Sequence, residues 1–200
     1  MNETAESTEL SDRQDMGALG TGDDVALNRL MSRHGERLFH YLIRLLQDET
    51  EASELAQETF VRVYLNRQRF DPKKKFATWL YSIATNLARD QWRRRSRHPH
   101  VSLDAQSGDS DQALANVLPA EQRSPCEELE REENAQLVRD ALAGLPEDLR
   151  TPLLLAEYEE MPQAEIALTL GCSVKAIENR IHRARQRLRA FLARAFLAAR

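Results

Sequence analysis

Seven side chains near the C-terminus could bind nucleic acid, because each can donate a hydrogen bond to a phosphate or to a base edge. They are Lys175, Asn179, Arg180, His182, Arg183, Gln186 and Arg187. From residue 171 to the end, the chain carries eight lysines and arginines and a single acidic residue, Glu178. A solvated surface helix would also be basic, so the elements that carry these side chains decide between the two interpretations.

The basic side chains lie opposite an apolar stripe with helical spacing. Its members are Ile166, Ala167 and Leu170, followed by Val174, Ile177, Ile181, Ala184 and Leu188. This spacing predicts two helices that each bury one face. Gly171 and Cys172 separate the two helices, and the hydroxyl of Ser173 is placed to cap the second one. The pattern therefore predicts a helix-turn-helix whose second helix can enter the major groove of DNA.

A second basic block follows the turn at Asp71-Pro72. It begins with three consecutive lysines and ends in three arginines, with aromatic residues between them (Lys73, Lys74, Lys75, Trp79, Tyr81, Trp92, Arg93, Arg94 and Arg95), and a further aromatic residue, Phe70, directly precedes the turn. Aromatic rings among cations suit stacking on unpaired bases beside a charged track for the phosphates. The alternative remains open that Trp79 and Tyr81 are core aromatics and that the arginines serve solubility.

Charge is segregated along the chain, although the net charge is only −4. Residues 29–99 carry fifteen basic and eight acidic side chains, and residues 100–135 carry two basic and nine acidic ones. Residues 1–28 are acidic as well, with seven acids and one arginine. Two basic blocks separated by an acidic stretch indicate two nucleic-acid contacts joined by a segment that repels DNA.

Helical periodicity accounts for most of the chain, and no strand pattern of any length is present. We expect an all-α protein with two small helical domains, at residues 23–97 and 126–200. Residues 1–22 have few apolar groups and are expected to form a disordered acidic tail. Residues 98–125 lack a period and are expected to form a flexible acidic linker.

The sequence lacks the signals that are typical of several classes of function. No apolar run approaches the roughly 20 residues of a membrane span, and the acidic start lacks the pattern of a signal peptide, so we expect a cytoplasmic protein without membrane insertion. Cys126 and Cys172 are the only cysteines, and their spacing indicates neither a disulfide nor a metal site. No acidic metal cluster, phosphate loop or nucleophile motif predicts an enzyme or a cofactor.

Two stretches in tandem resemble the extracytoplasmic-function (ECF) sigma factors, a class of small sigma subunits of bacterial RNA polymerase. Residues 49–95, which include FATWLYSIATNLARDQWRR, resemble sigma region 2. Residues 142–189, which include EIALTLGCSVKAIENRIHRARQRLR, resemble sigma region 4. The order of the two motifs makes the signal specific. The resemblance implies a sigma factor that binds core RNA polymerase and directs promoter recognition, DNA melting and transcription initiation.

The resemblance also implies roles for residues of the first domain. Leu55, Gln57, Glu58 and Phe60 would bind the clamp helices of the polymerase β′ subunit through an exposed apolar and acidic face. Phe70, Lys73, Lys74, Lys75, Trp79, Asn86, Arg93 and Arg94 would bind the single-stranded non-template strand at the −10 element. Asn86 would line a pocket for a flipped-out base, where an amide can both donate and accept. Alternatively, Asn86 is a surface residue or an internal hydrogen-bond partner.

In the second domain, the resemblance places the readers of the duplex −35 element at Glu178, Asn179, His182 and Arg183. Arg180 and Arg187 would contact phosphates, and Lys175 belongs to the same surface. Glu178 departs from the family pattern, because glutamate accepts from cytosine but repels phosphate. It could instead pair with Lys175 or His182.

Partners other than DNA follow only from the resemblance. The polymerase β flap would contact the second domain, and the acidic linker would enter the RNA exit channel. An anti-sigma factor is a common partner in this family, but no residue of the sequence demonstrates one.

An alternative is a helix-turn-helix regulator that acts without being a polymerase subunit. It accounts for residues 140–192 but leaves the basic and aromatic block at 73–97 unexplained. Binding of a duplex operator in the absence of polymerase would favour it.

Overall fold

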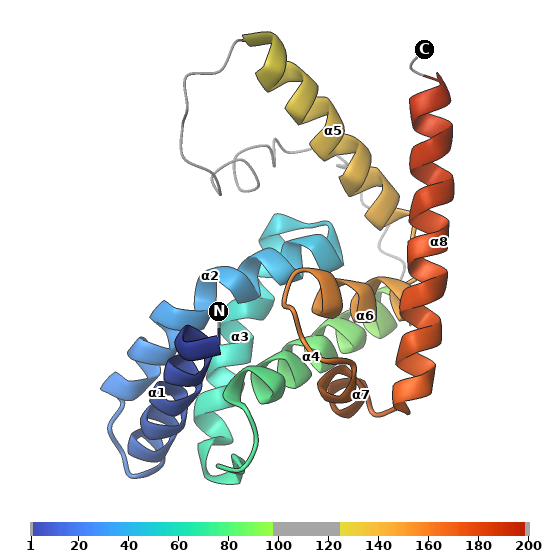
Figure 1. Ribbon diagram of the computed structural model, residues 1–200. Coiled ribbons are helices and arrows are strands. Elements are labelled where there is room, and N and C mark those ends of the chain that lie inside the picture. The colour runs from blue at the N-terminus through green and yellow to red at the C-terminus, as the bar shows by residue number, and fades with distance from the viewer. Residues whose placement is uncertain (1, 98–124, 199–200) are drawn as a thin grey trace.

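The structure, a computed structural model, describes residues 2–97 and 125–198. Within these ranges it consists of helices joined by short turns, without strands (Figure 1). The elements are α1 (Asn2–Gly20), α2 (Val25–Leu46), α3 (Glu49–Leu65), the 3₁₀ helix η1 (Arg67–Arg69), α4 (Phe76–Arg97), α5 (Pro125–Ala143), α6 (Glu147–Glu157), α7 (Gln163–Leu170) and α8 (Val174–Ala198). The prediction of an all-α fold is confirmed. The expected linker lies outside the described residues, except for Pro125, which begins α5.

Helices α2, α3 and α4 pack around a shared apolar core. The largest fully buried side chains include Leu38, Tyr41 and Leu42 of α2 and Phe76 and Leu80 of α4. The buried hydroxyl of Tyr41 lies 2.9 Å from the hydroxyl of Thr85, so this buried polar group has a hydrogen-bond partner. Asp48 begins α3 by accepting a hydrogen bond from the backbone N–H of Glu51 at 2.9 Å.

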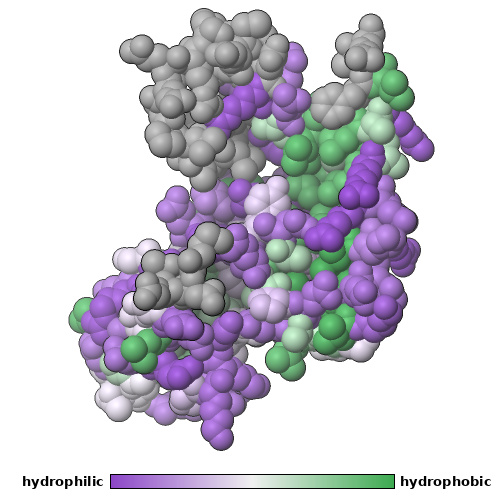
Figure 2. All heavy atoms as spheres, in the orientation of Figure 1, coloured by the Kyte–Doolittle hydropathy of each residue, from purple (hydrophilic) through white to green (hydrophobic). Residues whose placement is uncertain are grey.

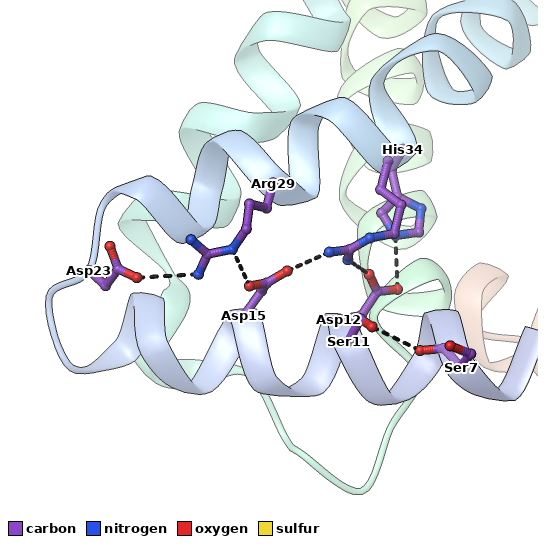
Figure 3. A network of polar contacts seen from close by, with 8 residues as sticks. Ser7, Ser11, Asp12, Asp15, Asp23, Arg29 and His34 are labelled. Atoms are coloured by element: carbon purple, nitrogen blue, oxygen red, sulfur yellow. Dashed lines mark hydrogen bonds and ion pairs between the residues drawn. The ribbon is translucent and has the colours of Figure 1, made fainter.

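The expected disordered tail at residues 1–22 is wrong, because residues 2–20 form α1, which packs along α2. Met16 and Leu19 of α1 are buried in the core. The acidic side chains that suggested disorder have partners on α2, where Asp12 contacts Arg33 and His34 and Asp15 contacts Arg29 and Arg33 (Figure 3). These pairs offset the cost of removing the carboxylates from water.

The C-terminal helices α5 to α8 form the second group. Leu149, Leu154 and Leu155 of α6 are buried together with Ile166 of α7 and Ile177 of α8. Helix α8 is long and lies beside α5 and α6 (Figure 1). The two groups of helices contact each other, since α7 packs on α4 and α6 packs on α2.

Candidate nucleic-acid interface

The helix-turn-helix is formed by α7 and α8, as predicted. Gly171 ends α7 with φ at 65°, in the left-handed region that glycine reaches without a steric penalty. The N–H of Cys172 donates to the carbonyl of Ala167 at 3.0 Å, which satisfies one of the last carbonyls of α7. The hydroxyl of Ser173 accepts from the N–H of Ala176 at 3.2 Å and so caps α8.

Helix α8 separates its apolar and polar side chains to opposite sides. Ile177, Ile181 and Ala184 are buried, whereas Val174, which the sequence placed in the apolar stripe, is 47% exposed. Most of the predicted DNA-binding side chains are exposed (Lys175, Glu178, Asn179, His182, Arg183 and Arg187). Their spacing of three and four residues brings them to one face of the helix.

Arg180 differs from its neighbours, because it is half-buried and its Nη1 atom lies 3.8 Å from the sulfur of Cys172. Arg180 therefore lies against the turn of the motif. Glu178 pairs with Lys175, with 2.8 Å between the carboxylate and Nζ, which agrees with one of the pairings expected from the sequence. The hydrogen bond from Lys175 lowers the pKa of Glu178, so this carboxylate is charged at neutral pH.

A surface cavity of about 290 Å³ lies between α3 and α4. It is lined by Arg62, Asn66, Arg69, Trp79, Ile83, Asn86, Leu87 and Asp90. Trp79, Ile83 and Leu87 give the cavity an apolar wall, and amide, guanidinium and carboxylate groups can donate and accept hydrogen bonds. The structure places Trp79 and Asn86 at one cavity, whereas the resemblance implied a pocket only for Asn86. Sequence reasoning missed Arg62, Asn66, Arg69 and Asp90, although Asp90 follows Asn86 by one helical turn.

The aromatic residues near this cavity divide between surface and core. Trp79 is half-buried, with its ring centroid 5.3 Å from that of Phe70 and 6.3 Å from that of Phe76. It is both a packing residue and a wall of the cavity. Tyr81 is buried, and its hydroxyl donates to Glu159, so of the two alternatives Tyr81 is a core aromatic.

The cations near the cavity have different surroundings. Lys73 and Lys74 are exposed in the turn before α4. Lys75 instead pairs with Glu165 of α7, with 2.8 Å between Nζ and the carboxylate, and the hydrogen bond raises the pKa of Lys75. Arg93 and Arg94 are exposed on the last turns of α4, where Arg93 lies 3.5 Å from Asp90.

Helix α3 presents a different face from the one expected. Leu55 and Phe60 are buried in the core, so the expectation that they belong to an exposed face is wrong. Gln57 is exposed, and Glu58 accepts a hydrogen bond from Arg62 at 2.7 Å. The exposed apolar side chains of α3 are Val61 and Leu65, which are 49% and 67% exposed. They follow Gln57 at four-residue spacing and so share its side of the helix.

Among the residues that the structure describes, no group of three or more His, Cys, Asp or Glu side chains could hold a metal ion. In the same part of the chain, no helix combines the length and the apolar character needed to cross a membrane.

The two groups of helices each match a family description of the sigma-70 type. The family description Sigma-70 region 2 matches residues 30–98, and Sigma-70, region 4 matches residues 135–188. The RNA polymerase sigma-H factor of Pseudomonas aeruginosa is 33% identical over 90% of this chain and 92% of its own. The ECF RNA polymerase sigma factor SigW of Bacillus subtilis is 32% identical over 84% and 89%.

Solved structures agree with this assignment. CnrH, solved in complex with the cytosolic domain of CnrY, is 30% identical and covers 92% of this chain and 97% of its own, with a TM-score of 0.67. The sigma factor RpoE of Bartonella quintana, solved with the anti-sigma factor NepR, shares the fold at a TM-score of 0.65 and 22% identity, over 83% of this chain and 96% of its own. The chain belongs to the ECF RNA polymerase sigma factors. It is therefore a transcription initiation factor that acts with core RNA polymerase, and not an enzyme.

Proposed function

We propose that this sigma factor divides promoter recognition between two surfaces. The α3–α4 cavity receives an unpaired base of the non-template strand at the −10 element, and the exposed face of α8 reads the −35 element. The observation that carries this proposal is the cavity itself, because the amide of Asn86 and the ring of Trp79 both line it. A base flipped out of the stack needs an apolar wall for its faces and hydrogen-bonding groups for its edge.

The cations around the cavity suit the backbone of the same strand. Arg62 and Arg69 lie at its wall, and Lys73 and Lys74 are exposed in the adjacent turn, whereas Phe70 is half-buried against Trp79. Contacts of this kind add affinity that falls with salt and carry little sequence information. Arg93 and Arg94 extend the charged track along the last turns of α4.

On α8, Asn179, His182 and Arg183 contact the base edges in this proposal. All three are exposed in the half of the helix nearer the turn between α7 and α8. Arg187 contacts phosphate further along, and Arg180 supports the turn and the phosphate next to it. Because Lys175 pairs with Glu178, the carboxylate can approach a base amino group with part of its repulsion of phosphate offset.

Core polymerase contacts two other surfaces in this proposal. The face of α3 formed by Gln57, Glu58, Val61 and Leu65 binds the β′ clamp helices, since it combines exposed apolar and polar groups. Apolar surface also gathers over the upper part of α8 (Figure 2). On the last two turns of α8, Phe191 and Leu197 are 39% and 74% exposed. This surface of α8 offers a site for the β flap.

An anti-sigma factor has its own candidate site. A cavity of about 380 Å³ between α2 and α5 has apolar walls at Ile43, Val138 and Leu142, with Arg44 and Arg131 at its edge. CnrH and RpoE were each solved with a protein partner, and their likeness to this chain supports a partner of the same kind here. An amphipathic helix with acidic flanks fits these walls and charges.

The proposal is tested by run-off transcription with bacterial core polymerase on a pooled genomic promoter library, with and without this protein. We expect transcripts that appear only in its presence, and their upstream sequences give the −10 and −35 elements. A lack of transcripts together with sequence-specific duplex binding in the absence of polymerase would instead support the regulator that acts alone.

A further inference from the structure

The cavity between α2 and α5 differs in charge from the chain as a whole. Among the described residues that line it, three are arginines (Arg44, Arg131 and Arg139) and none is acidic. The whole chain has 32 acidic side chains against 28 lysines and arginines. A recess whose charges share one sign concentrates ligands of the opposite sign. The cavity therefore favours an anion.

Helix α5 turns its arginines toward the cavity, although the helix itself is acidic. Its sequence contains six acids and two arginines. Both arginines line the cavity, whereas Glu132, Glu133 and Asp140 of the same helix do not. The positive charge of the cavity thus depends on the face of α5 that meets α2, and the composition of the helix does not reveal it.

The guanidinium group of Arg44 is held in place at the cavity by an aromatic ring. Its central carbon lies 4.3 Å from the centroid of the Tyr158 ring, which is a cation–π contact. The stacking uses the face of the guanidinium and leaves the N–H donors in its plane. The nearby acid Glu159 has partners of its own, because it accepts a hydrogen bond from Tyr81 and lies 3.4 Å from Nε of Arg37. Arg44 can therefore present two parallel N–H groups to the carboxylate of a ligand.

The walls between these arginines are largely apolar. Ala135, Val138 and Leu142 follow one another along α5 at spacings of three and four residues, so they share one face of the helix. Ile43 of α2 lines the same cavity. Val138 is 40% exposed, which leaves apolar surface that a ligand can cover. The cavity volume of about 380 Å³ lies near the lower end of the roughly 300–1,000 Å³ typical of small-molecule sites, so it suits one slender chain.

Other classes of ligand fit this cavity less well. Three arginines repel a metal ion or any other cation. A nucleotide needs an aromatic face on which its base can stack, but Arg44 already covers one face of Tyr158, and no other aromatic residue is among the described residues that line the cavity. A neutral lipid would gain nothing from the guanidinium groups. An amphiphile with an anionic head and an alkyl chain uses both the charges and the apolar walls.

We propose that this cavity binds a medium-chain fatty acid, whose carboxylate pairs with Arg44 and whose alkyl chain lies along Ile43, Val138 and Leu142. The carboxylate accepts two parallel hydrogen bonds from the guanidinium, and the walls remove the methylene groups from water. The same cavity is the site proposed above for an anti-sigma factor, so the two ligands exclude each other. That exclusion rests on the proposed function, whereas the binding of the fatty acid does not.

Binding is tested on the full chain by isothermal titration calorimetry with decanoate, below the concentration at which decanoate forms micelles. We expect one saturable site. Octanoate and hexanoate should bind more weakly, by up to about fourfold for each buried methylene group that they lack. Decyltrimethylammonium has the same alkyl chain with a cationic head, and acetate has the carboxylate without the chain. Neither should show saturable binding.

Two variants of the cavity test the head and the chain of the ligand separately. Arg44→Gln removes the guanidinium and should weaken decanoate binding about tenfold or more, as expected for the loss of a charge-assisted pair. Val138→Asp places an acid on the apolar wall and should abolish binding, while circular dichroism checks that both variants stay helical. Arg13→Gln is the matched control, because Arg13 of α1 pairs with Glu9 at 3.0 Å and does not line the cavity, so it should leave the affinity unchanged.

Hydrogen exchange locates the bound ligand. Decanoate should slow exchange in α5 and at the C-terminal end of α2 and leave α3 unchanged. Equal decanoate affinity in the wild-type chain, Arg44→Gln and Val138→Asp would overturn the proposal, as would equal affinity for decanoate and decyltrimethylammonium. If decanoate binds as expected but an anti-sigma factor binds the decanoate-saturated chain with unchanged affinity, the fatty-acid site stands and the assignment of the cavity to the anti-sigma factor is wrong.

Discussion

The Oδ1 atom of Asp15 on α1 lies 2.6 Å from the Nε atom of Arg29 on α2 (Figure 3). The other oxygen of the same carboxylate accepts from Arg33, which also contacts Asp12. Asp15 is buried, so its charge depends on these two guanidinium groups for compensation. The carboxylate therefore fixes α1 to α2, the helix in which the match to Sigma-70 region 2 begins at residue 30.

Replacing Asp15 with alanine should loosen α1. The change leaves Arg33 with one fewer acceptor in a partly buried position, and we expect a loss of about 1–2 kcal/mol in the free energy of unfolding. Hydrogen exchange should become faster in α1 than in α3 or α4. Glu9→Ala is the control, because Glu9 pairs with Arg13 within α1 near the surface, and it should change stability little. Equal exchange rates in wild type and Asp15→Ala would show that apolar contacts alone hold α1.

The same carboxylate predicts how stability depends on pH. Burial by itself raises the pKa of Asp15, but hydrogen bonds from Arg33 and Arg29 outweigh it and hold the pKa below its ordinary value of 3.8. A group with a lowered folded-state pKa adds stability above its unfolded pKa, and this contribution is lost as the pH falls through the folded-state value. The stability difference between wild type and Asp15→Asn, measured by urea unfolding, should be constant near neutral pH and shrink below about pH 3.8.

The sequence predicted most helices because they combine a clear apolar period with caps, as at Asp48 and Ser173. It failed at α1 because the partners of Asp12 and Asp15 are far away along the chain, between 14 and 22 residues further on. A prediction made from neighbouring residues alone therefore finds acids without basic partners and few apolar groups. Gly35 lies within an unbroken α2, although glycine is unfavourable in the interior of a helix.

The site was predictable to the extent that its residues share one helix. Lys175 to Arg187 come together on α8 through spacing alone. The α3–α4 cavity needs Arg62 and Asn66 opposite Asn86, and that relation depends on how two helices pack. On α3, the apolar residues Leu55 and Phe60 could not be divided from Val61 and Leu65 by type, because all four suit either a core or an interface.

Two adjacent residues of α3 should therefore behave differently. Phe60 is buried, and Phe60→Ala should destabilise the fold by about 3–5 kcal/mol. Val61 is exposed, and Val61→Glu should leave the melting temperature nearly unchanged but weaken binding to core polymerase. Thermal unfolding and core affinity are measured on both variants. Wild-type core affinity in Val61→Glu would remove this face of α3 from the polymerase interface.

Asn86→Ala should impair promoter opening more than the closed complex. The amide would hold a base only after the base leaves the stack, so duplex binding does not depend on it. Permanganate reactivity of unpaired thymines reports opening, and mobility shift reports the closed complex. Asn28→Ala, which removes an exposed amide from α2, is the control and should affect neither. Equal losses in both assays would remove the assignment of the cavity to a flipped base.

Arg183→Ala should weaken recognition of the −35 element by about 1–3 kcal/mol, because a well-placed arginine discriminates bases by an amount of this size. The loss of affinity should depend on one base pair of the −35 element. When that base pair is already changed, Arg183→Ala should have little further effect on the affinity. Arg194→Ala is the matched control, since Arg194 is exposed on the same helix about three turns further from the turn. If Arg194 contacts only phosphate, its loss weakens all sequences alike and reduces the salt dependence of binding. An unchanged −35 preference in Arg183→Ala, measured by competition among promoter variants, would mean that another face of α8 reads the DNA.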